Sequence, residues 1–182
     1  MFNVNNNKIL KIYAMKKLLV ILTVCCIVSG VASGHDNGRE KRKAREKAKS
    51  EEVQKLFESR SLQFLAQSAQ PMGGGIIHLT SDYSLDIDNG MITSYLPFYG
   101  VAYTAEYGER EGGIKFSETE KVSEWKVTRK GYRVRIDVKA PKDLYHLNLT
   151  FSSLGYAMLD VSCQNRQSIS YTGVVQPIPV KK

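Results

Sequence analysis

The sequence predicts a mainly β protein, a curled antiparallel meander of about nine or ten strands preceded by one charged helix. From Ser61 onward apolar and polar residues alternate, a pattern typical of antiparallel strands that bury one face. The segments between the alternating runs are mostly short, and no internal repeat or linker divides them. We therefore expect one β domain at 61–176, folded as a closed barrel or as a two-layer sandwich.

The clearest predicted strand is Gly131–Lys139. Tyr132, Val134, Ile136 and Val138 share its apolar face, and Arg133, Arg135, Asp137 and Lys139 share the polar one. Inward positions predicted on the following strands are Tyr145, Leu147, Leu149 and Phe151, then Ala157, Leu159, Val161 and Cys163, then Ile169 and Tyr171. Upstream, Ile114 and Phe116 are separated by one polar residue, and Trp125 and Val127 alternate with charged residues. Both segments therefore have the same two-residue period.

Asn89-Gly90 predicts a hairpin with a two-residue type I′ turn, because both residues tolerate positive φ. This turn pairs Asp88 with Met91 and Ile87 with Ile92. The same register collects Tyr83, Leu85, Ile87, Ile92 and Leu96 on one face. Turn type and hydrophobic pattern therefore agree on the register.

The N-terminal region predicts export. Translation is expected to start at Met15, where two lysines precede the uncharged apolar run 18–28 and the small residues 29–33. This order is typical of a secretory signal peptide, and the run is shorter than the roughly 20 apolar residues of a membrane-spanning helix. We expect cleavage after Ala32 or Ser33 and a periplasmic location. The alternative is a lipid anchor on Cys25, for which Val24 is a poor neighbour.

Export changes the interpretation of the net charge of +8. Residues 33–182 carry 22 Lys/Arg and 18 Asp/Glu, a net charge of +4. Segment 35–60 holds nine of those basic residues against six acidic ones, whereas the region from Met72 onward holds 13 against 12. Because the β region is nearly neutral and no basic–aromatic recognition motif is found, no nucleic-acid partner is expected.

The charged segment 33–60 predicts a helical spacer, since 38–59 lacks Pro and is rich in helix formers. Only Val53, Leu56 and Phe57 form an apolar turn, and we expect that turn to dock on the β domain. The alternative is a basic surface helix that binds anionic lipid or an envelope polymer. Residues 177–182 are predicted to form a short tail.

Most residues that could act as nucleophiles or metal ligands have structural explanations. Cys163 is the one cysteine after residue 32, so no internal disulfide is expected, and its apolar face predicts a buried, inert thiol. His78 and His146 should face outward on separate strands, which makes a shared metal site improbable. The acidic residues Asp82, Asp86 and Asp88 belong to the hairpin and lack calcium-loop spacing.

No catalytic residues and no cofactor are predicted. Met72-Gly73-Gly74-Gly75 lacks the Lys-Ser/Thr end of a phosphate loop, and no Gly-x-Ser-x-Gly elbow occurs. We therefore expect a non-enzymatic protein, with an unrecognised hydrolase as the alternative.

An aromatic segment separates two predicted strands at 95–113. It contains Tyr95, Phe98, Tyr99, Tyr103 and Tyr107. In one interpretation these rings stack on a glycan or hydrophobic ligand at the mouth of a barrel. In the other, which we favour, they plug the open end of the core.

Cleavage of the signal peptide would create a new N-terminus, and one cleavage position would place a metal site there. If cleavage follows Ala32, the mature chain begins Ser33-Gly34-His35. The free amine, two backbone amides and the imidazole of a third-position histidine can form a square-planar site for Cu(II) or Ni(II). Cleavage one residue later would abolish it.

Several phrases occur together in a familiar order and spacing. They are Pro71-Met72-Gly73-Gly74, Leu79-Thr80-Ser81-Asp82-Tyr83, Ser94-Tyr95-Leu96-Pro97-Phe98-Tyr99-Gly100, Gly112-Gly113-Ile114-Lys115-Phe116 and Asn165-Arg166-Gln167-Ser168-Ile169-Ser170-Tyr171-Thr172-Gly173. Over about residues 50–175 the chain resembles the exported domain-of-unknown-function family numbered 4251 of Bacteroidetes. The resemblance implies a signal peptide and an envelope location, and no activity or site residues.

Together these features predict an exported periplasmic domain with a non-enzymatic binding or envelope-interaction role. The alternative is a small barrel that carries an apolar ligand or glycan at the aromatic segment. The expected partner is an envelope protein or a small ligand, and the expected state is a monomer without a transmembrane segment in the mature chain.

Overall fold

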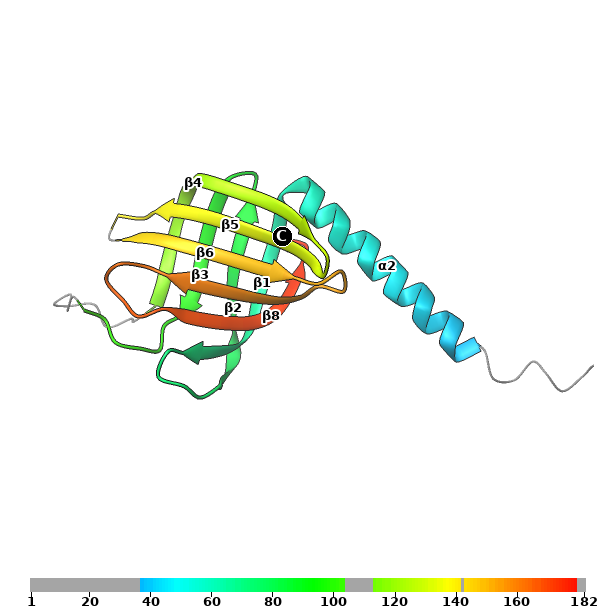
Figure 1. Cartoon of the computed structure of the whole chain (residues 1–182), viewed down its shortest axis with the longest axis horizontal. Helices are drawn as coiled ribbons and strands as arrows, with labels where there is room; N and C mark the ends of the chain where they lie inside the picture. Colours follow the sequence, from blue (N-terminus) through cyan, green and yellow to red (C-terminus); the bar gives the residue numbers. More distant parts are fainter. Residues whose placement is uncertain (1–36, 104–112, 142, 180–182) are drawn as a thin grey trace, which may run out of the picture. The chain divides into compact units, whose positions relative to one another are not determined.

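The computed structural model describes residues 37–103, 113–141 and 143–179 (Figure 1). The chain divides into two compact units, residues 1–44 and 45–182, and the first contributes only the start of helix α2 to the described part. The elements are α2 (Asn37–Ser59), β1 (Ser61–Pro71), β2 (Ile77–Asp88), β3 (Met91–Pro97), β4 (Gly113–Thr128), β5 (Gly131–Lys139), β6 (Leu144–Phe151), β7 (Tyr156–Ser162) and β8 (Ile169–Gln176). The predicted charged helix and mainly β domain are both present.

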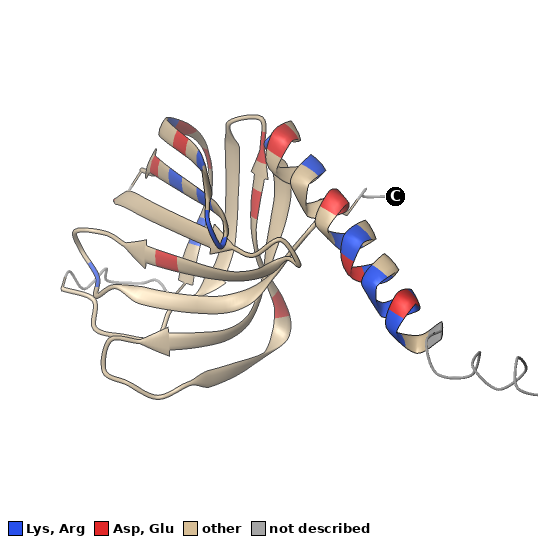
Figure 2. Ribbon diagram, turned by 45° about the vertical axis from the view of Figure 1, so that its right-hand side comes forward, with Lys and Arg blue, Asp and Glu red and all other residues tan. Residues whose placement is uncertain are grey.

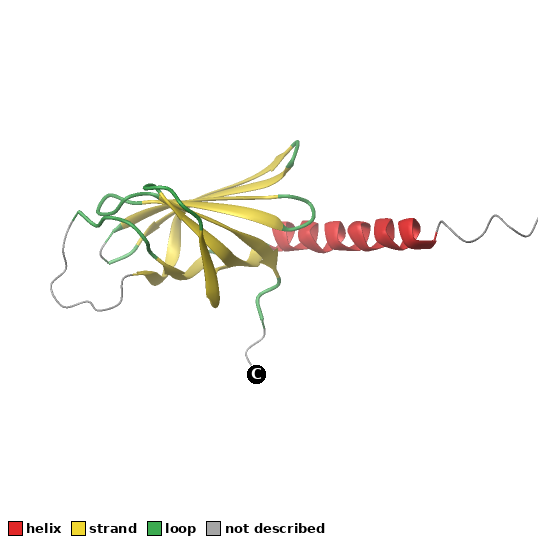
Figure 3. Cartoon of the chain, turned by 90° about the horizontal axis from the view of Figure 1, so that it is seen from below, coloured by secondary structure: helices red, strands yellow, loops and turns green. Residues whose placement is uncertain are grey.

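The described strands form one closed antiparallel barrel in the order β1 to β8, with β8 returning to pair with β1. Figure 3 shows the strands in yellow. This decides between the two predicted architectures in favour of the barrel. Eight strands are described, fewer than the nine or ten expected. The difference arises because β2 and β4 are single long strands of 12 and 16 residues, each of which spans two segments of alternating sequence.

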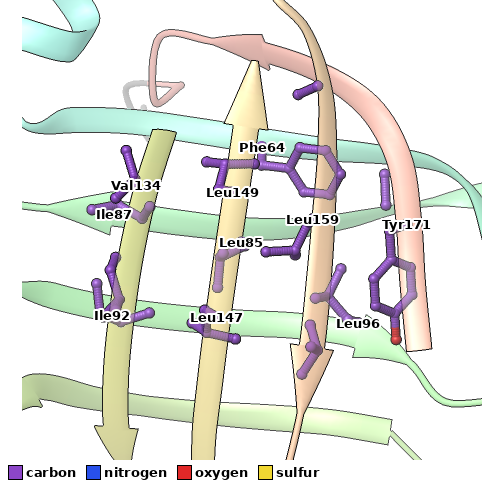
Figure 4. Close-up of a cluster of buried hydrophobic side chains, with 14 of the residues drawn as sticks. Phe64, Leu85, Ile87, Ile92, Leu96, Val134, Leu147, Leu149, Leu159 and Tyr171 are labelled. Atoms are coloured by element: carbon purple, nitrogen blue, oxygen red, sulfur yellow. The ribbon is translucent and has the colours of Figure 1, made fainter. Parts of the chain in front are cut away.

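Side chains from all parts of the barrel wall fill its interior (Figure 4). The predicted inward positions of β5, β6, β7 and β8 are buried, except that Tyr132 and Cys163 are half-buried. Fully buried large side chains include Phe64, Leu85, Phe151, Leu159 and Tyr171. A barrel of about eight strands has an interior just wide enough for side chains to fill. Each large apolar side chain buried there stabilises the fold by roughly 1.5–3 kcal/mol.

The hairpin between β2 and β3 has the predicted turn and register. Asn89 and Gly90 have φ of 48° and 92°, as a type I′ turn requires. Cα partners run from Asp88 with Met91 through Ile87 with Ile92 to Ser84 with Tyr95. Beyond Ser84 no partner on β3 follows, whereas the other edge of β2 continues to pair with β1, including Tyr83 with Ala66.

The last turns of α2 dock on the barrel, as the apolar turn predicts. Val53 is fully buried. The ring centroid of Phe57 lies 4.6 Å from that of Tyr132 and 5.5 Å from that of Trp125. Most of the other described side chains of α2 are exposed, and Lys, Arg and Glu are dense along it (Figure 2).

Closure between β1 and β8 depends on a close backbone approach at Gly173. A Cβ atom on Gly173 would lie 2.0 Å from the carbonyl oxygen of Leu65, so no side chain fits there. The Cα partners of Gly173 are Ala66 on β1 and Ala157 on β7, both small. β1 carries a bulge between Ala66 and Ser68 in its pairing with both neighbours, which bends the wall at this point.

Gly173→Ala should destabilise the barrel far more than Gly90→Ala. We expect a loss of about 3 kcal/mol or more at Gly173, because the backbone of β1 must move. At Gly90 only positive-φ strain applies, roughly 1–2 kcal/mol, since the nearest atoms to a new Cβ lie at 3.6 Å or beyond. Chemical denaturation followed by circular dichroism measures both, with Gly73→Ala as a control that meets no atom within 4 Å. Equal losses at Gly173 and Gly90 would contradict the role assigned to the close approach.

Candidate functional site

Four connections gather at one end of the barrel, which we call the loop end. Their described residues are 72–76 between β1 and β2, 98–103 between β3 and β4, 140, 141 and 143 between β5 and β6, and 163–168 between β7 and β8. An up-and-down meander places alternate connections at the same end.

The described part of the β3–β4 connection is held against the β7–β8 connection. Tyr103 donates its backbone N–H to the carbonyl of Asn165 at 2.8 Å. Gln167 and Val101 interact twice, because the backbone N–H of Gln167 donates to the Val101 carbonyl and the side chain of Gln167 accepts from the Val101 N–H. The β1–β2 connection follows Pro71, whose Cα partner on β8 is Ile169. Hydrogen bonds therefore join the β3–β4 and β7–β8 connections, and strand pairing brings the start of the β1–β2 connection to the same end.

Arg166 on the β7–β8 connection contacts both ends of the β3–β4 connection. Its guanidinium donates to the carbonyl oxygen of Gly113 at 2.9 Å. The guanidinium carbon also lies 5.4 Å from the ring centroid of Phe98, within the range of a cation–π interaction. Sequence reasoning did not single out Arg166, because both partners are more than 50 residues away along the chain.

Asp143 is the buried carboxylate of the loop end, with 9% of its surface exposed. Its Oδ1 accepts from the backbone N–H groups of Leu144 at 2.9 Å and Gln164 at 3.2 Å. Its Oδ2 accepts from the N–H of Asn165 at 3.3 Å. These bonds hold the turn after β7 against β6, so Asp143 has a structural explanation that the sequence pattern did not reveal.

Cys163 lies next to this carboxylate, just beyond the end of β7. Burial is the main reason that its pKa rises to about 11, and the neighbouring Asp143 carboxylate raises it further. The thiol is half-buried rather than fully buried as predicted. At neutral pH it is protonated, which agrees with the predicted inert thiol.

The aromatic segment divides between the core and the surface. Phe98 and Tyr99 are half-buried and pack on the core, as the plug interpretation predicts. Beneath them, buried Tyr171 donates its hydroxyl to the carbonyl of Pro97 at 2.5 Å. Burial raises the pKa of Tyr171, and nearby Tyr99 contributes to the shift.

The other tyrosines of the segment lie outside the core. Tyr95 is 48% exposed, stacks on Tyr83 at a centroid distance of 5.6 Å, and has the Lys115 ammonium 4.9 Å above its ring. Tyr103 is 65% exposed. Tyr107 lies outside the described residues. The five aromatics predicted as one ligand site are therefore not shown together at one site.

Large apolar side chains are exposed at the loop end. Met72, Ile76, Val101 and Tyr103 each expose more than half of their surface. We call these four residues the apolar rim. Sequence reasoning noted Tyr103 but missed Met72 and Ile76, because exposure in a Gly-rich connection leaves no periodic signal.

A hollow of about 370 Å³ opens at the loop end where β4 bulges next to β5. Its lining residues are Lys121, Lys139, Ala140, Pro141, Asp143, Leu144, Gln164 and Asn165. Lys121 and Lys139 are exposed, whereas the Asp143 carboxylate is occupied by backbone donors. The hollow therefore presents two lysine side chains toward solvent.

The remaining predicted residues do not converge on a site. His78 is exposed on β2, and His146 is exposed on β6, where its Nδ1 lies 2.7 Å from Oδ1 of Asp137. Within the described ranges, no group of three or more His, Cys, Asp or Glu is arranged to hold a metal ion. Asp86 accepts from Gln63 at 2.8 Å, and Asp88 accepts from Asn89. Ser33, Gly34 and His35 lie outside the described residues.

Among the described residues, no helix combines the length and the apolar character needed to cross a bilayer. The longest stretch of helix, α2, is mostly charged.

The fold and the loop end define a small, closed, eight-stranded β-barrel domain with a helical N-terminal extension. The family model described as "Domain of unknown function (DUF4251)" matches residues 44–175, and the chain belongs to this family. The resemblance seen in the sequence is thereby confirmed.

A solved structure supports the same fold. The crystal structure of a DUF4251 family protein from Bacteroides eggerthii DSM 20697 superimposes with a TM-score of 0.58 at 15% sequence identity. The alignment covers 71% of this chain and 88% of that one. No curated protein matches the sequence.

Asp143→Asn should lower the pKa of Cys163 while leaving it above the ordinary thiol value. The substitution removes the negative charge, but burial remains as the larger cause. The rate of iodoacetamide alkylation against pH, measured on the chain from residue 33, reports this pKa. The matched control is Asp160→Asn on the outer wall, whose carboxylate accepts from Asn148 and Ser170. An unchanged Cys163 profile in Asp143→Asn would show that burial alone sets the pKa.

Proposed function

We propose that this protein is an exported, non-enzymatic binding domain that contacts an envelope protein through the loop end of its barrel. The observation that carries the proposal is the apolar rim, Met72, Ile76, Val101 and Tyr103, whose exposed fractions are 73%, 65%, 56% and 65%. Large apolar side chains gathered on one surface are typical of protein interaction sites.

The way in which the rim is supported favours recognition by a preorganised surface. Backbone hydrogen bonds hold Val101 and Tyr103 on the β7–β8 connection, and Arg166 braces the base of the loop. Because the backbone of this part of the rim is already ordered, its binding would cost less conformational entropy than ordering a flexible loop.

The hollow beside the rim indicates the character of the partner. Lys121 and Lys139 face solvent there, so a partner with acidic groups next to an apolar surface complements both features. Side chains of this kind steer association more than they add affinity, and the interaction should weaken as ionic strength rises.

The filled interior argues against the carrier alternative. Phe98 and Tyr99 pack on the core, and Tyr171 is hydrogen-bonded to Pro97 at the same end. A ligand in the barrel would have to displace these side chains.

Export should be visible as a shorter chain in the periplasmic fraction. Intact-mass spectrometry of protein recovered after osmotic shock should give a chain that begins at Ser33 or Gly34, because the signal peptide is removed. Replacing the apolar run, for example Leu19→Arg together with Ile21→Arg, should retain the uncleaved chain in the cytoplasm. A chain in the cytoplasmic fraction that keeps residues 15–32 would contradict export, and a lipid mass on Cys25 would establish an anchored form instead.

The binding surface can be mapped by photo-crosslinking in cells. A benzoylphenylalanine placed at Tyr103 should form an adduct with one defined protein, whereas the same probe at Val127 should not. Val127 is a matched control because it is 73% exposed and lies near the other end of β4. Met72→Ser with Val101→Ser should reduce the Tyr103 adduct about tenfold, since two apolar contacts are lost. Equal labelling from Tyr103 and Val127 would contradict the loop-end surface, and a stoichiometric small molecule in native mass spectra would favour the carrier.

A further inference from the structure

A second depression lies on the outer wall of the barrel, away from the loop end. Its volume is about 500 Å³. The lining residues are Gln67, Lys130, Thr150, Phe151, Ser152, Tyr156, Ala157, Met158, Thr172 and Gly173. They come from β1, β6, β7, β8 and the adjoining β4–β5 and β6–β7 turns, so the depression is a groove that crosses several strands. It shares no residue with the apolar rim or with the basic hollow.

The pairing register explains which groups the groove presents. Thr150, Met158 and Thr172 are cross-strand neighbours on β6, β7 and β8, in the outward-facing row. The adjacent row, Ala157 and Gly173, faces inward and is buried, so these residues offer backbone atoms only. Gln67 is the residue turned outward by the bulge of β1 and borders the groove on that side.

The chemistry of the lining combines one exposed ring with neutral hydrogen-bonding groups. Tyr156 is 70% exposed and Met158 is 47% exposed. Neutral polar groups are supplied by Gln67, Thr150, Ser152 and Thr172. Lys130 is the one charged residue of the lining.

Some of this hydrogen-bonding capacity is unused. The Ser152 Oγ is shielded from solvent and has no hydrogen-bond partner within the described part of the chain. Thr172 shares a 2.5 Å hydrogen bond with Ser68, which leaves acceptor capacity on both hydroxyls. Because it is shielded, the Ser152 hydroxyl is not available to a ligand in the groove, whereas the exposed hydroxyl of Thr172 is.

We propose that this groove binds an extended, neutral chain of hexopyranose units. The C–H face of a pyranose ring packs on an exposed aromatic ring, and its equatorial hydroxyls require neutral donors and acceptors at the edges. Tyr156 provides the ring, and the neutral polar side chains of Gln67, Thr150 and Thr172 lie beside it in the lining. A groove that runs across strands accommodates an extended chain, and a single lysine without an acidic counterpart does not select a highly charged partner. This site is independent of the partner proposed for the loop end.

The test measures binding of cellohexaose and of its N-acetylated counterpart chitohexaose to the mature protein. Isothermal titration calorimetry should show saturable binding of at least one of them. Tyr156→Ala should weaken that binding about tenfold, whereas Tyr156→Phe, which keeps the ring, should change it less than about threefold. Met91→Ala is the control, because Met91 is 47% exposed on β3, lines neither the groove nor the loop end, and its loss should leave binding unchanged.

Three results would overturn the proposal. The first is the absence of saturable binding to both oligosaccharides by the unsubstituted protein. The second is equal binding by Tyr156→Ala and the unsubstituted protein, with circular dichroism showing that both are folded. The third is a dimer in sedimentation velocity that dissociates in Tyr156→Ala without any sugar binding, since the groove would then be an interface between two copies. Loss of the Tyr103 crosslink affects only the loop-end proposal, so the two can fail separately.

Discussion

The pairing of β1 with β8 is the constraint on which the rest of the structure depends. These strands are separated by about 100 residues of chain, and they meet over a register from Gln63 with Gln176 to Pro71 with Ile169. Closure leaves no unpaired edge in that part of the sheet, and it sets how many side chains the interior must hold. It is possible only because Gly173 lets the two backbones approach, with a small Ala66 opposite.

Closure also decides where function can be located. The barrel is narrow, and its interior is occupied by side chains such as Phe64, Phe151 and Tyr171. Each of these exposes at most 1% of its surface. Phe98 and Tyr99 fold over the loop end and pack on the same core. A ligand or partner would therefore have to meet the outer surfaces, namely the connections at the loop end and the curved wall. A binding site on a preformed surface does not require opening of the core, so stability and binding do not compete there.

The parts of the structure that follow from local sequence were predictable, and those that follow from contacts between distant residues were not. Asn89-Gly90 predicts both its turn and the register of its hairpin, because positive φ and the facing apolar residues are local properties. Alternation likewise identifies the inward residues of β5 and β6. Barrel and sandwich share this alternation, so the choice between them required the β1–β8 pairing. Tyr103 and Phe98 belong to one aromatic segment, yet only Phe98 packs on the core, since a connection without periodicity carries no signal for burial.

The same physical feature that closes the barrel also shapes its outer wall. The bulge in β1 bends the strand next to Gly173, and the residue it turns outward, Gln67, becomes one side of the groove. The groove therefore draws its residues from positions as far apart as 67, 130, 156 and 172, which only closure brings together. The loop end draws on other residues, and its geometry is set by Arg166 and Asp143. Because the two surfaces share no side chain, a contact proposed at one uses no residue of the other, and substitutions can test them separately.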